Sequence, residues 1–224
     1  MSTNLIAYLS ERYYGQKKEP AGIDPYITLS RETGCNATGL AAELVKTFRK
    51  KGQHWHFVNK EILDKSAEKL HLDRHRIEHE FIFSKSSVMD NVIKAMSLRY
   101  FKSDKKIRDT ISEIIRYEAQ KGNVIIVGRA GVVSTSGIPN GLNIRLVAPL
   151  EWRVKSLIHR KLLPEEKAKE FIQEGDRKRN FLLEQFAGKP VSEIYFDLVI
   201  NTAVFSHQEI IHIILNAMEM KGML

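Results

Sequence analysis

The chain has 224 residues, 43% of them apolar and 28% charged, a balance typical of one soluble globular domain with a sizeable core. No apolar run approaches the roughly 20 residues that span a bilayer, the N-terminus has no secretory pattern, and Cys35 is the single cysteine. These features exclude a membrane protein and a disulfide scaffold, and they predict a cytoplasmic protein without membrane partners.

The net charge of +8 points to anionic partners, because excess Lys and Arg attract polyanions. The basic residues have acidic neighbours and do not alternate with aromatic residues, as they would in a platform that stacks single-stranded bases. We therefore expect nucleotide substrates and no nucleic acid, with most of the charge on solvated helix faces.

The first elements in the chain predict one α/β unit after an N-terminal extension. Residues 1–23 have no sustained period and end in turn-forming residues, so we expect one domain over 24–224. The run YITLS at 26–30 predicts a buried strand, and a glycine-containing turn separates it from an amphipathic helix over 40–50.

The next segments repeat this alternation. HWHFV at 54–58 predicts a second strand, and Asn59 is the expected N-cap of a helix that ends near residue 70. Residues 71–106 are polar with scattered helical periodicity and predict an inserted helical lobe. The helix over 107–120 stops at a glycine and leads into the apolar strand NVIIV.

The last third of the chain continues the alternation. LNIRLVA at 142–148 predicts a strand, Pro149 opens a helix, and a further helix covers 164–172. IYFDLVIN at 194–201 predicts the last strand, and Ser206 is the expected N-cap of a final helix. Strands that alternate with helices predict an α/β fold with a doubly wound parallel sheet and ligands at the carboxyl ends of its strands.

The turn after the first strand, SRETGCNATG, has the features of a phosphate-binding loop. Gly34 and Gly39 fit the pattern G-x-x-x-x-G, in which backbone N–H groups and a helix N-terminus bind phosphate oxygens. Leu40 and Ala41 stand where a standard loop has Lys and Ser or Thr. A turn that needs glycine only for steric reasons is the alternative. The candidate nucleotide-binding residues here are Ser30, Arg31, Gly34, Cys35, Asn36, Ala37, Thr38 and Gly39.

Two arginines directly follow predicted buried strands. Arg129 emerges through Gly128 at the carboxyl edge of the sheet, where a guanidinium can bind a phosphate through two parallel hydrogen bonds. Arg31 ends the first strand and reaches the same edge. The alternatives are an ion pair with a core carboxylate for Arg129 and a solvated edge with Glu32 for Arg31.

The charged run EGDRKRN contains the remaining candidates for catalysis, Asp176, Arg177 and Arg179. Cations here could stabilise the charge that develops during phosphoryl transfer. On the residues alone, a solvated helix end is the preferred explanation of the run.

Several segments together resemble the cytidylate kinase-like family, and the resemblance covers nearly everything from Tyr26 onward. The most specific pieces are SRETG, VGRAG and the pair APLEWRV and DRKR. The resemblance implies a P-loop kinase fold with a helical monophosphate-binding lobe at about 71–106 and a lid at about 174–189. The family loop typically reads Gly-Ser-Gly-Gly-Arg, whereas Asn36, Ala37 and Thr38 replace two glycines and the arginine here.

The resemblance also implies a function. It predicts a nucleotide kinase-like phosphotransferase that moves the γ-phosphate of ATP to a CMP-like or dCMP-like acceptor, with ATP and Mg²⁺ as cofactors. Arg129 and Arg31 would hold the acceptor, Arg153 would line the nucleotide site, and the Asp176 to Arg179 run would act as the lid. The alternative is a catalytically degenerate protein of the same fold that binds a nucleotide or another phosphorylated ligand. A homo-oligomer is compatible with either, and no residue is assigned to a metal.

Overall fold

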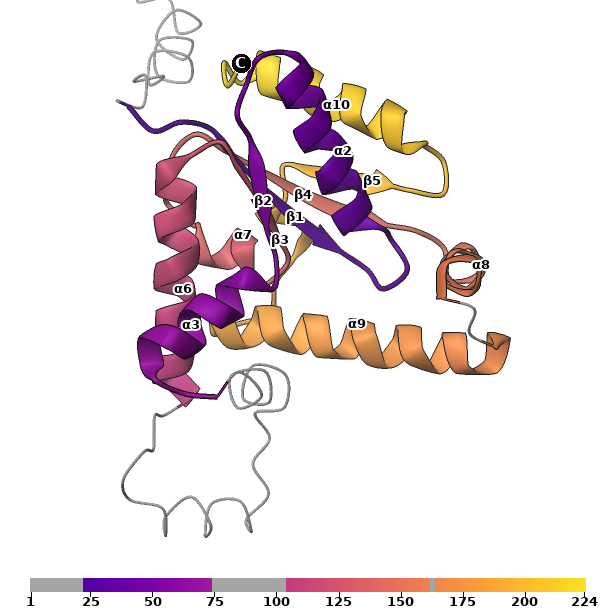
Figure 1. The fold of residues 1–224 in the computed structure, drawn as a ribbon. Helices are drawn as coiled ribbons and strands as arrows, with labels where there is room; N and C mark the ends of the chain where they lie inside the picture. The colour runs from indigo at the N-terminus through magenta and orange to yellow at the C-terminus, as the bar shows by residue number, and fades with distance from the viewer. Residues whose placement is uncertain (1–21, 74–103, 162–163) are drawn as a thin grey trace, which may run out of the picture.

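A computed structural model describes residues 22–73, 104–161 and 164–224 (Figure 1). Most of the predicted N-terminal extension and of the predicted lobe at 71–106 lies outside these residues. Among the described residues, no helix has the length and apolar character that a bilayer crossing requires.

Five parallel strands form the sheet, in the order β2-β3-β1-β4-β5. They are β1 (Tyr26–Arg31), β2 (His56–Val58), β3 (Val124–Val127), β4 (Gly141–Val147) and β5 (Leu198–Asn201). All residues of β3 are buried, as its unbroken apolar sequence predicts for a central parallel strand. The predicted doubly wound parallel sheet is confirmed.

Helices cover both faces of the sheet (Figure 1). One face packs against α2 (Ala37–Lys50) and α10 (His207–Met220), which share the largest apolar cluster with the strands. The other face carries α3 (Glu61–Leu70), α6 (Asp104–Lys121), α7 (Gly131–Ser134) and α9 (Glu165–Ala187), while α8 (Leu150–Lys161) follows β4.

The two faces of β1 and β4 differ in polarity. Ile27 and Leu29 of β1 belong to the cluster with α2 and α10. Their neighbours Thr28 and Ser30 pair in register with Asn143 and Arg145 of β4, and Thr28 Oγ1 donates to Asn143 Oδ1 at 2.7 Å. A strip of polar side chains therefore runs along the opposite face toward the carboxyl ends of the central strands.

Several elements differ from the predictions. The helix predicted for 164–172 continues to Ala187 and ends where Gly188 adopts a left-handed conformation, so the charged run 174–180 is helical. The last strand is short, because residues 193–195 form a 3₁₀ turn. The short helix α7 was not predicted.

The predicted caps have opposite outcomes. Ser206 caps α10 in a full capping box with Glu209, as expected from its sequence. Asn59 does not cap α3: the helix begins at Glu61, with Lys60 at the N-cap position. The Glu61 carboxylate accepts the Asn59 backbone N–H at 2.8 Å, which draws Asn59 into the preceding turn.

Candidate functional site

The loop between β1 and α2 is compact, and its first glycine is sterically required. Gly34 has φ of +102°, and a Cβ there would lie 2.8 Å from the Arg153 Cβ. Asn36 is the N-cap of α2, and its Oδ1 accepts the Gly39 N–H at 3.2 Å. The predicted loop thus ends early, because Ala37, Thr38 and Gly39 already belong to the helix.

Three backbone donors of this loop are open to a ligand. The N–H groups of Gly34, Asn36 and Thr38 have no hydrogen-bond acceptor within the described part of the chain. The Thr33 N–H, by contrast, donates to Asp176 Oδ1 at 2.6 Å. The loop therefore offers donors for phosphate oxygens, and a carboxylate from α9 already occupies one neighbouring N–H.

The carbonyl side of the loop is held by α8. The Gly34 carbonyl accepts hydrogen bonds from Ser156 Oγ at 3.1 Å and from the Arg160 guanidinium. Cys35 is buried beside Thr202, and burial raises the pKa of its thiol, which disfavours a nucleophilic thiolate. Among the predicted loop residues, Cys35 and Ala37 therefore contribute packing and backbone shape.

Arg153 joins α8, the loop and α9. Its Nε donates to the Ala148 carbonyl at 2.9 Å, and its Nη1 donates to the Thr33 carbonyl at 3.2 Å and to Asp176 Oδ2 at 2.5 Å. The Glu32 carboxylate lies 3.4 Å from the same Nε. Only 8% of Arg153 is exposed, so protein groups surround this guanidinium and it fastens the site together.

Arg31 is the most strongly perturbed cation of the site. Burial and the nearby positive charges of Arg179 and Arg129 together lower the pKa of its guanidinium to about 10. The guanidinium lies against Gly128, where a Cβ would overlap it. Among the described residues, the Arg31 side chain forms no hydrogen bond or ion pair, so its charge is poorly compensated.

The backbone that carries Arg129 has an unusual conformation. Gly128, Arg129 and Ala130 all have positive φ values, of 73°, 56° and 55°. Residues other than glycine rarely adopt this region, and such strain concentrates at functional sites. The left-handed turn directs the chain from β3 into α7 and brings Arg129 within electrostatic range of Arg31.

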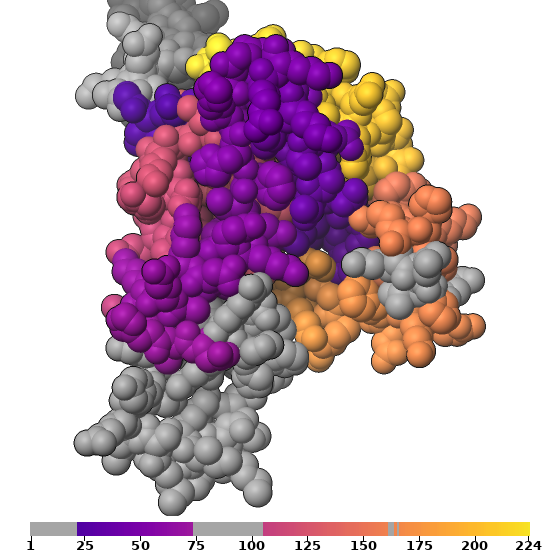
Figure 2. Space-filling view, viewed as in Figure 1, coloured from indigo at the N-terminus to yellow at the C-terminus, as the bar shows by residue number. Residues whose placement is uncertain are grey.

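Arg177 and Arg179 lie on different sides of α9. Arg179 donates to Thr33 Oγ1, next to the loop, and Gly175 allows this approach because a Cβ there would crowd both side chains. Arg177 is 77% exposed and pairs with Glu174 on the helix surface. Residues two positions apart in a helix lie on nearly opposite faces. The structure therefore brings Arg179 into the site and leaves Arg177 outside it. Figure 2 shows the surface of β1 and its loop beside that of α8 and α9.

The structure adds residues that the sequence analysis did not single out. Thr33, Ser156 and Arg160 fix the loop, and Arg145 of β4 lies beside Ser30. The alternation of polar and apolar residues in β4 was the available signal for Arg145. Hydrogen bonds between a loop and distant helices leave no such signal in one sequence.

The donor set suits phosphate better than a metal ion. Nowhere in residues 22–73, 104–161 and 164–224 do three His, Cys, Asp or Glu residues gather as a metal site would require. Leu40 and Ala41, at the positions of the usual Lys and hydroxyl ligand, are buried in the core. These residues do not fit Mg²⁺, whereas the open N–H groups and the arginines fit phosphate oxygens.

One solved structure has the same fold, and two shikimate kinases are similar to the chain at lower TM-scores. An uncharacterized protein from Eubacterium ventriosum has a TM-score of 0.64 at 17% identity, covering 88% of this chain and 98% of that chain. The shikimate kinase of Bacteroides thetaiotaomicron has a TM-score of 0.48 at 11% identity, covering 87% and 98%. The shikimate kinase of Acinetobacter baumannii, in complex with shikimate, has a TM-score of 0.45 at 14% identity, covering 88% and 94%.

The sequence gives the family directly. No curated protein matches the chain significantly. The pattern of the cytidylate kinase-like family matches residues 26–204, which contain the whole sheet, the loop and every arginine described above. The chain belongs to the cytidylate kinase-like family.

Proposed function

We propose that this protein is a nucleotide kinase-like phosphotransferase whose acceptor is a nucleoside monophosphate of the CMP or dCMP type. The observation that carries the proposal is the arginine cluster, which we define as Arg31, Arg129 and Arg179. Arg31 is partly buried, and both other guanidiniums are close enough to lower its pKa. Three like charges held together, with no carboxylate in the described part of the chain paired to Arg31, are the electrostatic signature of an anion site.

The residues have distinct proposed tasks. The arginine cluster binds the acceptor phosphate and stabilises the charge that spreads over the phosphoryl oxygens. The open N–H groups of Gly34, Asn36 and Thr38 orient the donor phosphates. Bound ATP would supply the phosphoryl group. Asp176 and Arg153 keep the loop and α9 together.

The experiment that tests this proposal is an assay of ADP release with ATP and each nucleoside monophosphate in turn. We expect turnover that depends on CMP or dCMP, and a loss of about a hundredfold or more for Arg129→Gln. The matched control is Arg49→Gln on the exposed face of α2, which should keep full activity. Absence of ADP release with every monophosphate would exclude the phosphotransferase.

A second candidate is a catalytically degenerate protein that binds a phosphorylated ligand without transferring phosphate. The loop favours this alternative, because it lacks the usual Lys and hydroxyl, and Asp176 occupies the Thr33 N–H. Isothermal titration calorimetry of CMP, ATP and both together separates the candidates. Binding without turnover supports the degenerate protein, and no binding of any nucleotide contradicts both.

The remaining features of the proposal extend beyond the site. We propose that the segment at about 71–106 binds the base of the acceptor and that 174–189, the second half of α9 and the turn after it, acts as the lid. We further propose a cytoplasmic protein with nucleotide substrates and no nucleic-acid partner. A homo-oligomer is compatible with this function, and sedimentation velocity measures it directly.

A further inference from the structure

A second polar site lies on the sheet face that α9 covers, next to the arginine cluster. Its central residue is Arg145, which sits beside Ser30 in the sheet register. Arg145 and α9 line an open cavity of about 370 Å³, whose other wall is the segment after α9 with Val191, Ser192 and Glu193. A narrow cavity of about 40 Å³ shares Arg145, Asn180 and Leu183 with it and extends to Arg31 and Arg179.

Arg145 has unused hydrogen-bonding capacity. Its side chain is only 18% exposed, and its Nε is a buried atom that has no hydrogen-bond partner among the residues that the structure describes. The nearest carboxylate oxygen, Glu193 Oε1, is 3.9 Å away, beyond hydrogen-bond distance, and the Phe196 ring centre lies 5.4 Å from the guanidinium carbon. A buried donor without an acceptor costs about 1–3 kcal/mol, so an arginine held this way is preorganised for a ligand.

The walls of the larger cavity specify the ligand chemistry. On the inner side Arg145 shares the narrow cavity with Arg31 and Arg179. The carboxylates of Glu32 and Asp176 line it too, so the three arginines leave a net positive charge that favours a phosphate or carboxylate. Toward the opening, Asn180, Glu184, Ser192 and Glu193 offer acceptors and donors that suit hydroxyl groups. Leu183 and Val191 form an apolar part of the wall that can pack against carbon atoms of the ligand. This volume suits a molecule of the size of a sugar phosphate or a hydroxy acid.

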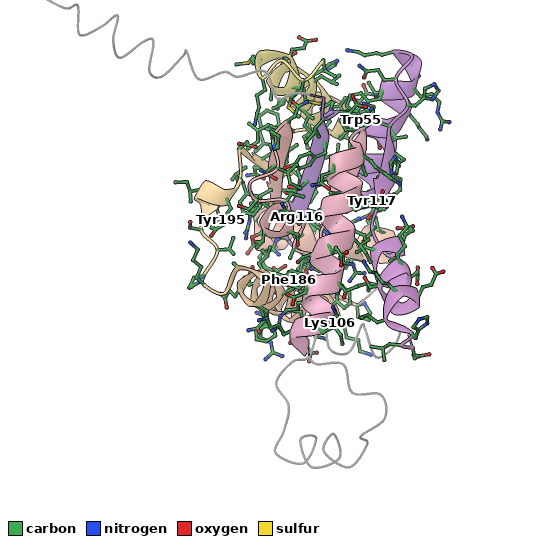
Figure 3. The ribbon with its side chains drawn as sticks, turned by 90° about the vertical axis from the view of Figure 1, so that its left-hand side faces the viewer. Trp55, Lys106, Arg116, Tyr117, Phe186 and Tyr195 are labelled. Carbon is green, nitrogen blue, oxygen red and sulfur yellow. The ribbon has the colours of Figure 1, made fainter. Side chains whose placement is uncertain are left out.

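We propose that the cavity at Arg145 is a binding site for a small hydroxylated organic anion, separate from the arginine cluster that takes the nucleotide phosphate. Its anionic group sits on the Arg145 guanidinium, and its hydroxyl groups face Glu184, Ser192 and Glu193. The cavity lies where the chain passes from α9 to β5. In Figure 3 this segment, marked by Tyr195, is on the opposite side of the molecule from α3.

The nearby arginines also predict how the two sites communicate. An anion on Arg145 lies close to Arg31 and Arg179, so it lowers the positive potential of the arginine cluster. A ligand in this cavity therefore weakens nucleotide phosphate binding at the cluster, and the effect is reciprocal. The site is thus suited to inhibition by a small metabolite.

Isothermal titration calorimetry on the full chain tests the proposal with ribose 5-phosphate, citrate and ribose as probes. We expect ribose 5-phosphate or citrate to bind and ribose not to bind, and whichever anion binds identifies the phosphate or carboxylate source. Arg145→Gln should weaken that binding at least about tenfold, the loss expected for a charged hydrogen bond. Arg49→Gln is the control with the same change of net charge.

A second variant tests the site without changing Arg145, whose substitution could also disturb the fold. Asn180 is exposed on α9, so Asn180→Asp should leave the fold intact while its charge repels the anion and weakens binding about tenfold. Arg129→Gln should leave this binding unchanged within twofold while it disrupts nucleotide binding. No binding of either anion, or binding that Arg145→Gln and Asn180→Asp both leave intact, would overturn the proposal.

Discussion

At the scale of single residues, Arg31 shows how a binding site costs stability. Burial lowers the pKa of its guanidinium to about 10, so the folded protein disfavours the charged form. A base with a lowered pKa in the folded state destabilises the fold below that pKa, and the penalty fades only as the pH rises above about 10. At neutral pH the protein therefore carries this penalty in full.

Arg31→Met tests this cost directly. Methionine fills a similar volume without the buried charge, so we expect the free protein to become more stable by about 1–3 kcal/mol at pH 7. Nucleoside monophosphate binding should fall at least about tenfold in the same variant. Urea unfolding and calorimetry give the two values, and a variant that is both less stable and unaffected in binding would contradict the assignment.

Gly128 and Gly52 separate backbone strain from contact with Arg31. Both have positive φ, of 73° and 78°, but a Cβ at 128 would overlap Arg31, whereas position 52 has open space. Alanine should cost about 1–2 kcal/mol at either site because of the left-handed backbone. Only Gly128→Ala should also weaken phosphate binding, since it displaces Arg31. Equal phosphate affinity in both variants would show that Arg31 does not belong to the phosphate site.

At the scale of elements, the run Asp176 to Arg179 illustrates what one sequence can and cannot predict. Its charge and its place in the family pattern predict a lid, which stays a prediction, and the structure shows that the run is the middle of α9. Because the two residues lie on different faces of the helix, Arg177 is exposed to solvent and Arg179 contacts Thr33. Which of the two arginines reaches the site depends on which face of α9 packs on the loop. That contact joins residues more than a hundred positions apart in the chain, so the local sequence does not reveal it.

The two arginines of α9 make a matched pair for experiment. Arg179→Gln should weaken nucleoside monophosphate binding about tenfold, because it removes a cation of the arginine cluster. Arg177→Gln changes the same helix by the same charge and should have no measurable effect. Calorimetry on both variants decides between the docked geometry and a lid that uses the whole run, in which case both variants would lose affinity.

Arg153 ties three elements together and gives a stability prediction. Arg153→Met leaves the partly buried carboxylates of Glu32 and Asp176 without their cation, which should destabilise the protein by about 3 kcal/mol. Arg49→Met on the exposed face of α2 is the control. Chemical denaturation measures both, and a loss below about 0.5 kcal/mol for Arg153→Met would mean that this network contributes little.

At the scale of the whole molecule, local patterns predicted the architecture well. The apolar strands 26–30, 123–127 and 142–148 and the alternation with helices were sufficient for the parallel sheet, because each pattern reports burial directly. The cluster of Arg31, Arg129 and Arg179 needed the strand order, which places β1 between β3 and β4. The cavity at Arg145 could not be predicted from the sequence, because it depends on where the segment after α9 packs.

The central claim is that arginines from β1, the turn after β3 and α9 bind one phosphate together. A crystal structure of the protein with CMP tests it most directly. We predict the phosphate within hydrogen-bond distance of Arg129 and of at least one of Arg31 and Arg179. A phosphate bound elsewhere, with these guanidiniums making no contact to it, would contradict the account.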